Sequence, residues 1–114
     1  LSRMKRFGQV IHLKPGCHAE YRRLHDNIWP EVVAAMHRAN MQNYSIYHWN
    51  GLLFGTFEYV GHDFESDMKA IANDPVTQKW WQHTDATQQP ISGNSTGSIH
   101  GGWWTDMEEM FHLD

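Results

Sequence analysis

A tyrosine and a histidine four residues apart are the first candidates for chemistry in this chain. Tyr21 and His25 fall in a segment with helical periodicity, so their side chains point the same way, one turn apart. A phenol beside an imidazole is able to pass a proton between oxygen atoms near neutral pH. The same spacing also suits a core tyrosine packed beside a helix histidine. Trp29 lies one further turn along this stripe.

The chain is also rich in aromatic side chains, with six tryptophans and four tyrosines, and it contains nine histidines. Aromatic rings combined with neutral hydrogen-bonding groups are typical of sugar sites, because sugars offer C–H faces and hydroxyls but no charge. On a helix, Trp80 and Trp81 would point about 100° apart, so that one ring packs in the core and the other borders a pocket. Trp103 and Trp104 follow a glycine-rich segment, and here too one ring would pack in the core while the other borders a pocket.

Several classes of function are disfavoured by the sequence. The histidines lie on different predicted elements without an HExxH pattern, and GxSxG and phosphate-loop motifs are absent, so we expect neither a metal nor a cofactor. The net charge of −4 argues against nucleic acid as a partner. No apolar run approaches the ~18–20 residues of a membrane span. A single cysteine, Cys17, excludes an internal disulfide and favours a cytoplasmic location.

The 114 residues are enough for one globular domain, which we expect to span residues 4–114. Leu1, Ser2 and Arg3 precede a methionine and are interpreted as a cloning remnant. Residues 5–13 alternate as a strand does. Residues 17–40 have the period of a helix, which Pro30 should kink or restart just after Trp29.

The middle of the chain predicts a β-hairpin, because Asn50-Gly51 separates two aromatic and β-branched runs and a type I′ turn needs positive φ twice. Asp63 is the predicted cap of one helix, and Asp74-Pro75 the predicted start of another. Residues 88–102 should be a loop, and residues 110–113 a last strand.

The resulting order of strand, helix, strand, strand, helix and strand predicts an α+β protein of ferredoxin-like topology, with an antiparallel sheet and helices on one face. Such a sheet leaves its other face bare. Aromatic side chains fall on both faces of the predicted hairpin, with Tyr44 and Ile46 on one face and Tyr47 and Trp49 on the other. We therefore expect a homodimer that covers the bare face.

Six blocks of sequence resemble, in order, those of the L-rhamnose mutarotase family. The two on the first predicted helix match the family pattern E-Y-x-x-x-H…I-W-P-E. The chain departs from the family in residues 84–105, where the usual M-x-x-x-N-P-D-N-S-P run is replaced by a longer loop. Its WWxxMEExFHxD tail is similar to a branch associated with L-fucose. The six blocks are residues 20–25 (EYRRLH), 28–31 (IWPE), 43–47 (NYSIY), 52–54 (LLF), 79–81 (KWW) and 109–113 (EMFHL).

The resemblance implies a dimeric α+β barrel enzyme that interconverts the α and β anomers of a 6-deoxy-L-hexose, L-rhamnose or L-fucose, without cofactor. In this family the helix histidine is the acid/base, which corresponds to His25. The sugar-contacting positions correspond to Tyr21, Tyr44, Trp80 and Trp81. Trp29, Trp103 and Trp104 are further candidates for a substrate loop.

A mutarotase needs an acid and a base on either side of the sugar ring, each contributing about 10²–10⁴-fold to the rate. Our hypothesis is that His25 protonates the ring oxygen, that Tyr21 or Tyr44 orients the anomeric hydroxyl, and that a tryptophan stacks on the sugar. Two alternatives stay open at this point. One is a small cofactorless or haem-dependent oxygenase of the dimeric α+β barrel type, and the other is a non-catalytic sugar-binding module.

Overall fold

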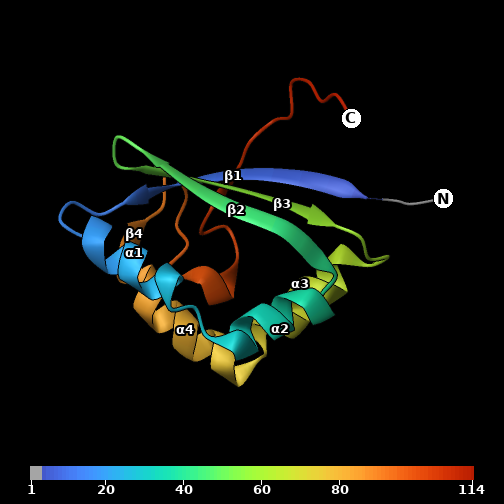
Figure 1. Ribbon diagram of the computed structural model, residues 1–114, viewed down its shortest axis with the longest axis horizontal. Coiled ribbons are helices and arrows are strands. Elements are labelled where there is room, and N and C mark those ends of the chain that lie inside the picture. Colours follow the sequence, from blue (N-terminus) through green and yellow to red (C-terminus); the bar gives the residue numbers. More distant parts are fainter. Residues whose placement is uncertain (1–3) are drawn as a thin grey trace.

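The computed structural model describes residues 4–114, so the interpretation of residues 1–3 lies outside the described part of the chain. One antiparallel sheet forms one layer of the fold and the helices form the other (Figure 1). Its strands run in the order β2-β3-β1-β4, and β5 pairs with β1 on the same edge as β4, at Gln9 and Val10. This order is the ferredoxin-like one that the element pattern predicts. The strands are β1 (Lys5–Leu13), β2 (Met41–Trp49), β3 (Leu52–Tyr59), β4 (Gln88–Gln89) and β5 (Thr105–Asp106).

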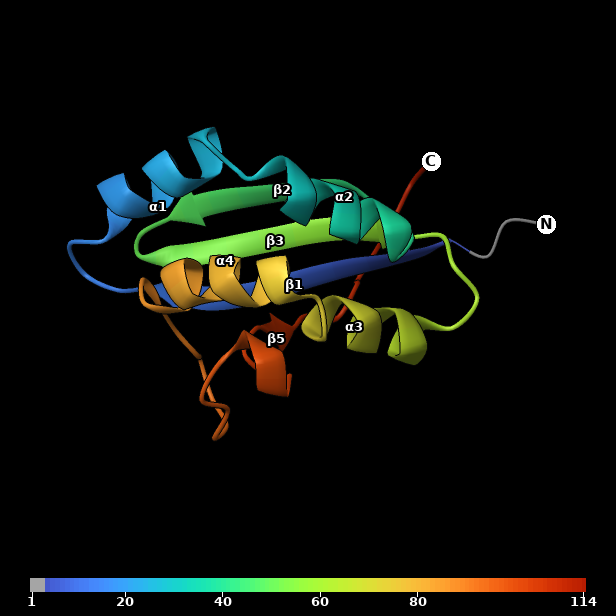
Figure 2. The same ribbon diagram turned by 90° about the horizontal axis from the view of Figure 1, so that it is seen from below.

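The helices all cover the same face of this sheet, as Figure 2 shows from their side. The restart predicted just after Trp29 is confirmed, because the chain leaves helical geometry at Asn27 and a second helix begins with Pro30 in its first turn. Asp63 and Asp74 cap the next two helices through their carboxylates, as predicted. The helices are α1 (His18–Asp26), α2 (Pro30–Arg38), α3 (Phe64–Ala72), α4 (Pro75–Asp85) and the short 3-10 helix η1 (Ser98–His100).

The predicted hairpin is confirmed as β2 and β3. Asn50 and Gly51 have φ of 51° and 76°, the two positive values that a type I′ turn requires. The pairing of β2 with β3 shifts register between Gln42 and Ser45. Met41 and Tyr44, on either side of this irregularity, both pack in the cluster around Phe57, so the hairpin holds a candidate site residue on the face covered by the helices.

The prediction of a last strand at residues 110–113 is wrong. The final strand is β5, a two-residue pairing that places Thr105 opposite Val10 and Asp106 opposite Gln9. The chain runs along the edge of β1 only as far as the Met107 N–H, which donates to the Gly8 carbonyl at 2.7 Å, and residues 110–113 pair with no strand among the described residues. The apolar residues 110–113 follow this pairing as an exposed tail, in which Met110 is 83% and Phe111 81% exposed.

The predicted loop at residues 88–102 contains β4 and η1 and is otherwise irregular. Asp85 at the end of α4 anchors it, because its carboxylate accepts hydrogen bonds from the backbone N–H and the hydroxyl of Ser98, at 2.9 and 2.6 Å. Among the described residues, no helix combines the length and the apolar character that crossing a bilayer demands.

The core lies between the sheet and the helices in three clusters of buried apolar side chains. One joins Ile11 and Leu53 of the sheet to Tyr21 of α1 and to Trp103 from the C-terminal segment. Another joins Phe57 of β3 to Ile71 of α3. The third packs α1, α2 and α4 together and includes Leu24, Val32 and Trp80. The candidate site residues lie at the junction of these clusters.

Candidate active site

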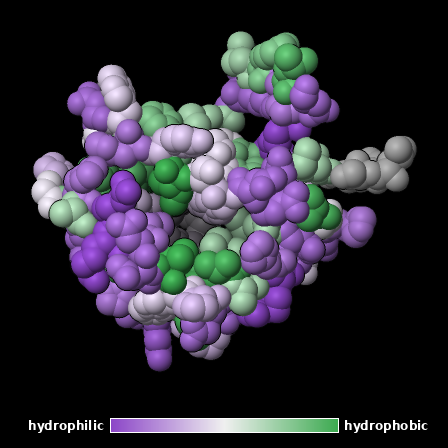
Figure 3. Space-filling model, viewed as in Figure 1, coloured by the Kyte–Doolittle hydropathy of each residue, from purple (hydrophilic) through white to green (hydrophobic). Residues whose placement is uncertain are grey.

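A cavity of about 700 Å³ opens between β2 and the helices, and it is visible as a hollow with apolar side chains at its rim (Figure 3). Side chains from α1, α2, β2 and α4 line it. A concave and largely apolar site with a few polar groups is the usual form of a small-molecule site. Five of the residues predicted from the sequence lie together in its lining: Tyr21, His25, Tyr44, Trp80 and Trp81.

Helix α1 places Tyr21 and His25 side by side. Gly16, with φ of 80°, turns the chain out of β1, and α1 then buries Tyr21 and Leu24 against the sheet. The phenol and imidazole ring centroids are 4.3 Å apart, with 30° between the ring planes. The helical spacing of these two residues thus predicts their contact correctly.

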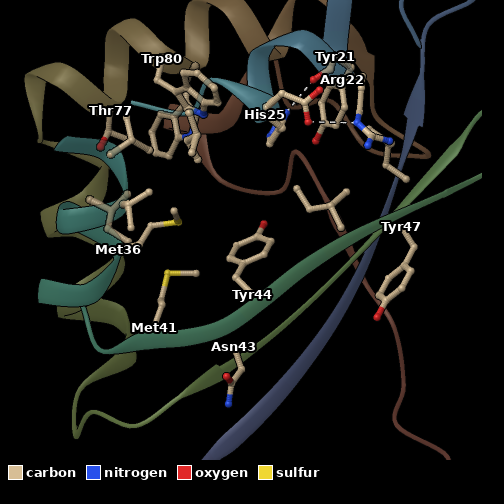
Figure 4. Close-up of a pocket in the computed structure, with 18 of the residues that line it drawn as sticks. Tyr21, Arg22, His25, Met36, Met41, Asn43, Tyr44, Tyr47, Thr77 and Trp80 are labelled. Atoms are coloured by element: carbon tan, nitrogen blue, oxygen red, sulfur yellow. Dashed lines mark hydrogen bonds and ion pairs between the residues drawn. The ribbon is translucent and has the colours of Figure 1, made fainter. Parts of the chain in front are cut away.

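A backbone hydrogen bond sets the tautomer of His25. Its Nδ1 lies 2.9 Å from the carbonyl oxygen of Tyr21. A carbonyl oxygen only accepts, so Nδ1 carries the hydrogen and donates it. In the neutral imidazole, Nε2 is therefore left with a lone pair, and Figure 4 shows the ring among the residues that line the cavity.

Burial lowers the pKa of His25 below its ordinary value of 6.5. The hydrogen bond to the Tyr21 carbonyl and the charge of Asp26 act in the opposite direction, but the effect of burial is larger. His25 is consequently neutral at pH 7. A neutral imidazole with a free Nε2 is arranged to accept a proton first and to return it later.

Two phenols share the cavity with this imidazole. Tyr44 reaches from β2 toward α1 (Figure 4), with its ring stacked on Phe57 at a centroid distance of 5.3 Å. Burial raises the pKa of Tyr44 to about 12. The pKa of Tyr21 is raised as well, chiefly by burial and further by the nearby Tyr44. Both phenols therefore keep their protons at neutral pH and are available as hydrogen-bond donors.

The two tryptophans of α4 form the wall opposite β2. Trp80 is buried, and its ring lies edge-on to the His25 imidazole with 5.4 Å between centroids. Trp81 is partly buried and also lines the cavity. Trp29 stands behind them and packs edge-on against Trp80 at 5.3 Å and against His83 at 5.7 Å. Trp29 supports the wall and does not line the cavity.

Trp103 and Trp104 also lie behind the site. Both pack in the cluster that contains Tyr21. The Trp104 ring crosses the inner face of β3 at Gly55, where an added Cβ would lie 3.3 Å from Cζ3 of Trp104 and 3.6 Å from the hydroxyl of Tyr44. A glycine at this position lets Trp104 approach the backbone and support Tyr44 from behind.

Gln88 is a buried residue of this region that the sequence reasoning missed. Its side chain lies between the hydroxyl of Tyr21 and the indole of Trp103, with hydrogen bonds to both. Gln88 begins the two-residue strand β4, in a segment that the sequence predicts as a loop, and a glutamine in a loop is ordinarily exposed. No local pattern distinguishes it, because its environment is created by residues distant in sequence.

Polar groups at the mouth of the cavity were also missed. Arg22 and Asp26 line it and pair with each other, with 3.2 Å between Nε and Oδ1. They directly follow Tyr21 and His25 in sequence, so the helical spacing that singles out the first pair also places the second beside it. His18 and His48 meet across the mouth, with ring centroids 4.8 Å apart. Within residues 4–114, no three potential metal ligands gather in one place.

The ferredoxin-like sheet carries a cavity walled by an imidazole, two phenols and two indoles, groups that suit a neutral, hydroxyl-rich ligand. A family model described as L-rhamnose mutarotase matches residues 6–113. The chain belongs to the L-rhamnose mutarotase family, which confirms the resemblance found in its sequence blocks. The oxygenase and binding-module alternatives have no support from these matches.

Individual relatives agree with this assignment. A protein of Jannaschia sp. named L-rhamnose mutarotase is 40% identical over 82 residues, covering 70% of this chain and 76% of its own length. One of Lactiplantibacillus plantarum, with the same name, is 33% identical over 111 residues, covering 97% of this chain and all of its own. A crystal structure of L-rhamnose mutarotase from Formosa agariphila shares the fold, with a TM-score of 0.72, 23% identity and coverage of 96% and 99% of the two chains.

Proposed function

We propose that this protein interconverts the α and β anomers of L-rhamnose by opening and reclosing the sugar ring. Family membership and the names of the relatives support the reaction and the sugar. The observation that carries the proposal for this chain is the contact of His25 with Tyr21. It joins a neutral imidazole with a free Nε2 to a protonated phenol inside a cavity large enough for a monosaccharide.

The lowered pKa of His25 favours a different opening step from the one suggested by the sequence. Nε2 of the neutral imidazole takes the proton of the anomeric hydroxyl. The bond between C1 and the ring oxygen then breaks, and the ring oxygen receives the proton of a phenol, Tyr21 or Tyr44. The open-chain aldehyde rotates about the C1–C2 bond. Reclosure returns one proton from the imidazolium to O1 and the other from the ring oxygen to the phenolate.

The wall of the cavity suits the remainder of the sugar. Trp80 and Trp81 offer aromatic faces to the C–H groups of a 6-deoxyhexose. The polar groups at the mouth, Arg22 and Asp26, are available for its hydroxyls. Neither set of contacts needs a charge on the ligand.

L-Rhamnose and L-fucose are distinguished by a direct experiment. Saturation-transfer NMR measures the exchange between the two anomers of each sugar at equilibrium, with and without the protein. We expect faster exchange of L-rhamnose than of L-fucose. The reverse preference would assign the protein to L-fucose and agree with its C-terminal tail, whereas exchange of neither sugar above the spontaneous rate would refute the proposed function.

We further propose a cytoplasmic homodimer that packs the bare faces of two sheets together. In the register of the sheet, Tyr47, Phe54 and Val10 lie in a row across the three long strands, and Tyr47 and Trp49 are 63% and 67% exposed. An apolar, exposed sheet face is characteristic of an interface. Light scattering coupled to gel filtration should give twice the chain mass of 13.4 kDa, and Trp49→Glu should shift it toward the monomer. A wild-type monomer at micromolar concentration would contradict this.

A further inference from the structure

Three buried side chains connect the C-terminal segment to the candidate site. The indole Nε1 of Trp103 donates to Oε1 of Gln88 at 3.0 Å. Nε2 of the same amide donates to the hydroxyl oxygen of Tyr21 at 3.4 Å, a longer and weaker bond. Trp103, Gln88 and Tyr21 are 8%, 2% and 7% exposed, so water does not compete freely for these groups.

The chemistry of these groups fixes the donor and the acceptor of each of the two hydrogen bonds. An indole N–H only donates, so the oxygen of the Gln88 amide must face Trp103. The amide nitrogen must then face Tyr21, and an amide NH₂ also only donates. The hydroxyl oxygen of Tyr21 is therefore the acceptor. Its own hydrogen has to point elsewhere.

The hydrogen of Tyr21 is left for a ligand. The Gln88 contact is the one hydrogen bond of the Tyr21 hydroxyl within residues 4–114, and Tyr21 lines the cavity. Tyr44, which also lines it, is held by ring stacking on Phe57, and its hydroxyl has no hydrogen-bond partner among the described residues. The hydrogen of Tyr21 is thus directed away from Gln88 and toward the cavity, whereas no hydrogen bond among the described residues sets the direction of the Tyr44 hydrogen.

We propose that Gln88 and Trp103 are positioning residues that hold Tyr21 as the hydrogen-bond donor to the ring oxygen of the sugar. This inference rests on the proposed function and selects Tyr21 over Tyr44 as the phenol that works with His25. It also gives the divergent C-terminal segment a role at the site without direct contact with the sugar. The Gln88 hydrogen bond acts to lower the raised pKa of Tyr21, which is the direction that helps a phenol to release its proton.

The nearly isosteric substitution Gln88→Glu tests the direction of the hydrogen bond between residue 88 and Tyr21. A carboxylate accepts from Trp103 and also from Tyr21, so it turns the Tyr21 hydrogen away from the cavity. We expect kcat at pH 8 to fall about tenfold, the value of one hydrogen bond, with a smaller change in KM. Burial raises the pKa of a carboxyl. At lower pH the protonated Glu should again donate to Tyr21 and restore kcat, so the variant gains activity as the pH falls.

The wild-type protein should show no such gain, because its activity is constant from pH 8 to about 7 and falls below 6.5, where His25 becomes protonated in both proteins. A purely structural role for Gln88 would lower activity at every pH alike. A Gln88→Glu profile parallel to that of the wild type would therefore overturn the proposal.

A double-mutant cycle tests whether Gln88 acts through Tyr21. It uses a neutral substitution, so its result does not depend on the charge that Gln88→Glu introduces. Gln88→Met removes both hydrogen bonds at similar volume and should also lower kcat about tenfold. In the Tyr21→Phe background the same substitution should change kcat less than twofold, because residues that act as a unit are not additive. Equal losses in the two backgrounds would overturn the proposal. Gln78→Met is the matched control, because the Gln78 amide bonds only the Ala72 carbonyl, at 2.7 Å.

The hydrogen-bond chain can be tested apart from activity. NMR of the tryptophan indole protons should show the Trp103 N–H protected from hydrogen–deuterium exchange in the wild type and exchanging at least tenfold faster in Gln88→Met. Unchanged protection in Gln88→Met would show that Trp103 does not donate to Gln88 and would overturn the proposal, even if the enzyme were active. A wild type that protects this proton but exchanges no sugar would instead refute the proposed function, and with it the role of Tyr21.

Discussion

The imidazole of His25 packs against the phenol of Tyr21 at a centroid distance of 4.3 Å while its Nδ1 donates to the backbone carbonyl of the same residue. One residue thereby orients both the plane and the tautomer of the histidine. The i,i+4 geometry of α1 makes both contacts at once. The acid/base function that we propose for His25 depends on this arrangement, because it leaves Nε2 free for the sugar.

Replacing His25 should remove the acceleration of anomer exchange while leaving the fold intact. His25→Ala should lower the enzyme-dependent rate by about 10²–10⁴-fold, the usual contribution of an acid/base group. Saturation-transfer NMR reports this rate, and circular dichroism reports the fold. His62→Ala is a suitable control because His62 is an exposed histidine outside the cavity lining. Wild-type rates in His25→Ala would show that another residue transfers the proton.

The pH dependence of the rate should reflect the neutral form of His25. The pKa of His25 is below 6.5 because of burial, so activity should be constant from pH 8 to about 7 and fall only below 6.5. The charge of Asp26 raises this pKa, so Asp26→Asn should move the acidic limb of kcat/KM to lower pH. An acidic limb that stays in place, or that moves to higher pH, would contradict this role of Asp26.

The same pKa shift predicts how stability depends on pH. Below pH 6.5 the unfolded chain binds a proton at this histidine more readily than the folded protein does. The contribution of His25 to the free energy of unfolding is therefore present above about pH 7 and decreases as the pH falls through 6.5. Urea denaturation of the wild type and His25→Gln between pH 5 and 8 should show the wild type losing more stability on acidification. Parallel curves would argue against a depressed pKa.

Substitutions of the two tryptophans of α4 should affect stability and sugar binding to different extents. Trp80 is 4% exposed in the core, so Trp80→Ala should lower the free energy of unfolding by about 3–5 kcal/mol. Trp81 is less buried. Trp81→Ala should cost less stability and raise KM about tenfold through loss of an aromatic contact. Thermal denaturation and substrate titration measure the two effects, and an unchanged KM in Trp81→Ala would remove Trp81 from the proposed sugar contacts.

The close approach of Trp104 to Gly55 should make that glycine intolerant of substitution. Gly55→Ala places a Cβ against the Trp104 ring and near the Tyr44 hydroxyl, and overpacking of this kind costs about 1–3 kcal/mol. Gly8→Ala on the neighbouring strand is the control, because its Cβ meets only the flexible end of Met107, at 3.4 Å. Equal stabilities of the two variants in urea denaturation would show that Trp104 does not press on this position.

The elements that hold the site were predictable because their determinants are local. Asn50-Gly51 specifies its turn through backbone φ, and Asp63 caps its helix within three residues. Pro30 begins the second helix because its ring fixes φ at a helical value, which is also a local effect. The contact of Tyr21 with His25 follows from helical spacing alone. Their placement opposite Tyr44 needed the family resemblance, because it depends on how α1 packs over β2.

The C-terminal part of the fold was not predictable in this way. Residues 110–113 have the composition of a strand, but pairing depends on where the chain runs beside a sheet edge, and the chain leaves the edge of β1 after Met107. Gln88 carries no distinguishing pattern, because its partners Tyr21 and Trp103 come from 67 residues before it and 15 after it. Trp103 was a candidate for a substrate loop, with packing in the core as the alternative. The structure places it behind Tyr21 instead, so what it contributes is a hydrogen bond and core packing.

Anomer exchange in L-rhamnose tests the central claim most directly. Saturation of one anomeric proton in NMR, with the purified wild type and with His25→Ala, compares the two rates on the same sugar without a coupled enzyme. We predict that the wild type transfers saturation to the other anomer well above the spontaneous rate and that His25→Ala returns it to that rate. Exchange at the spontaneous rate with the wild type, or equal acceleration by both proteins, would contradict a mutarotase that works through His25.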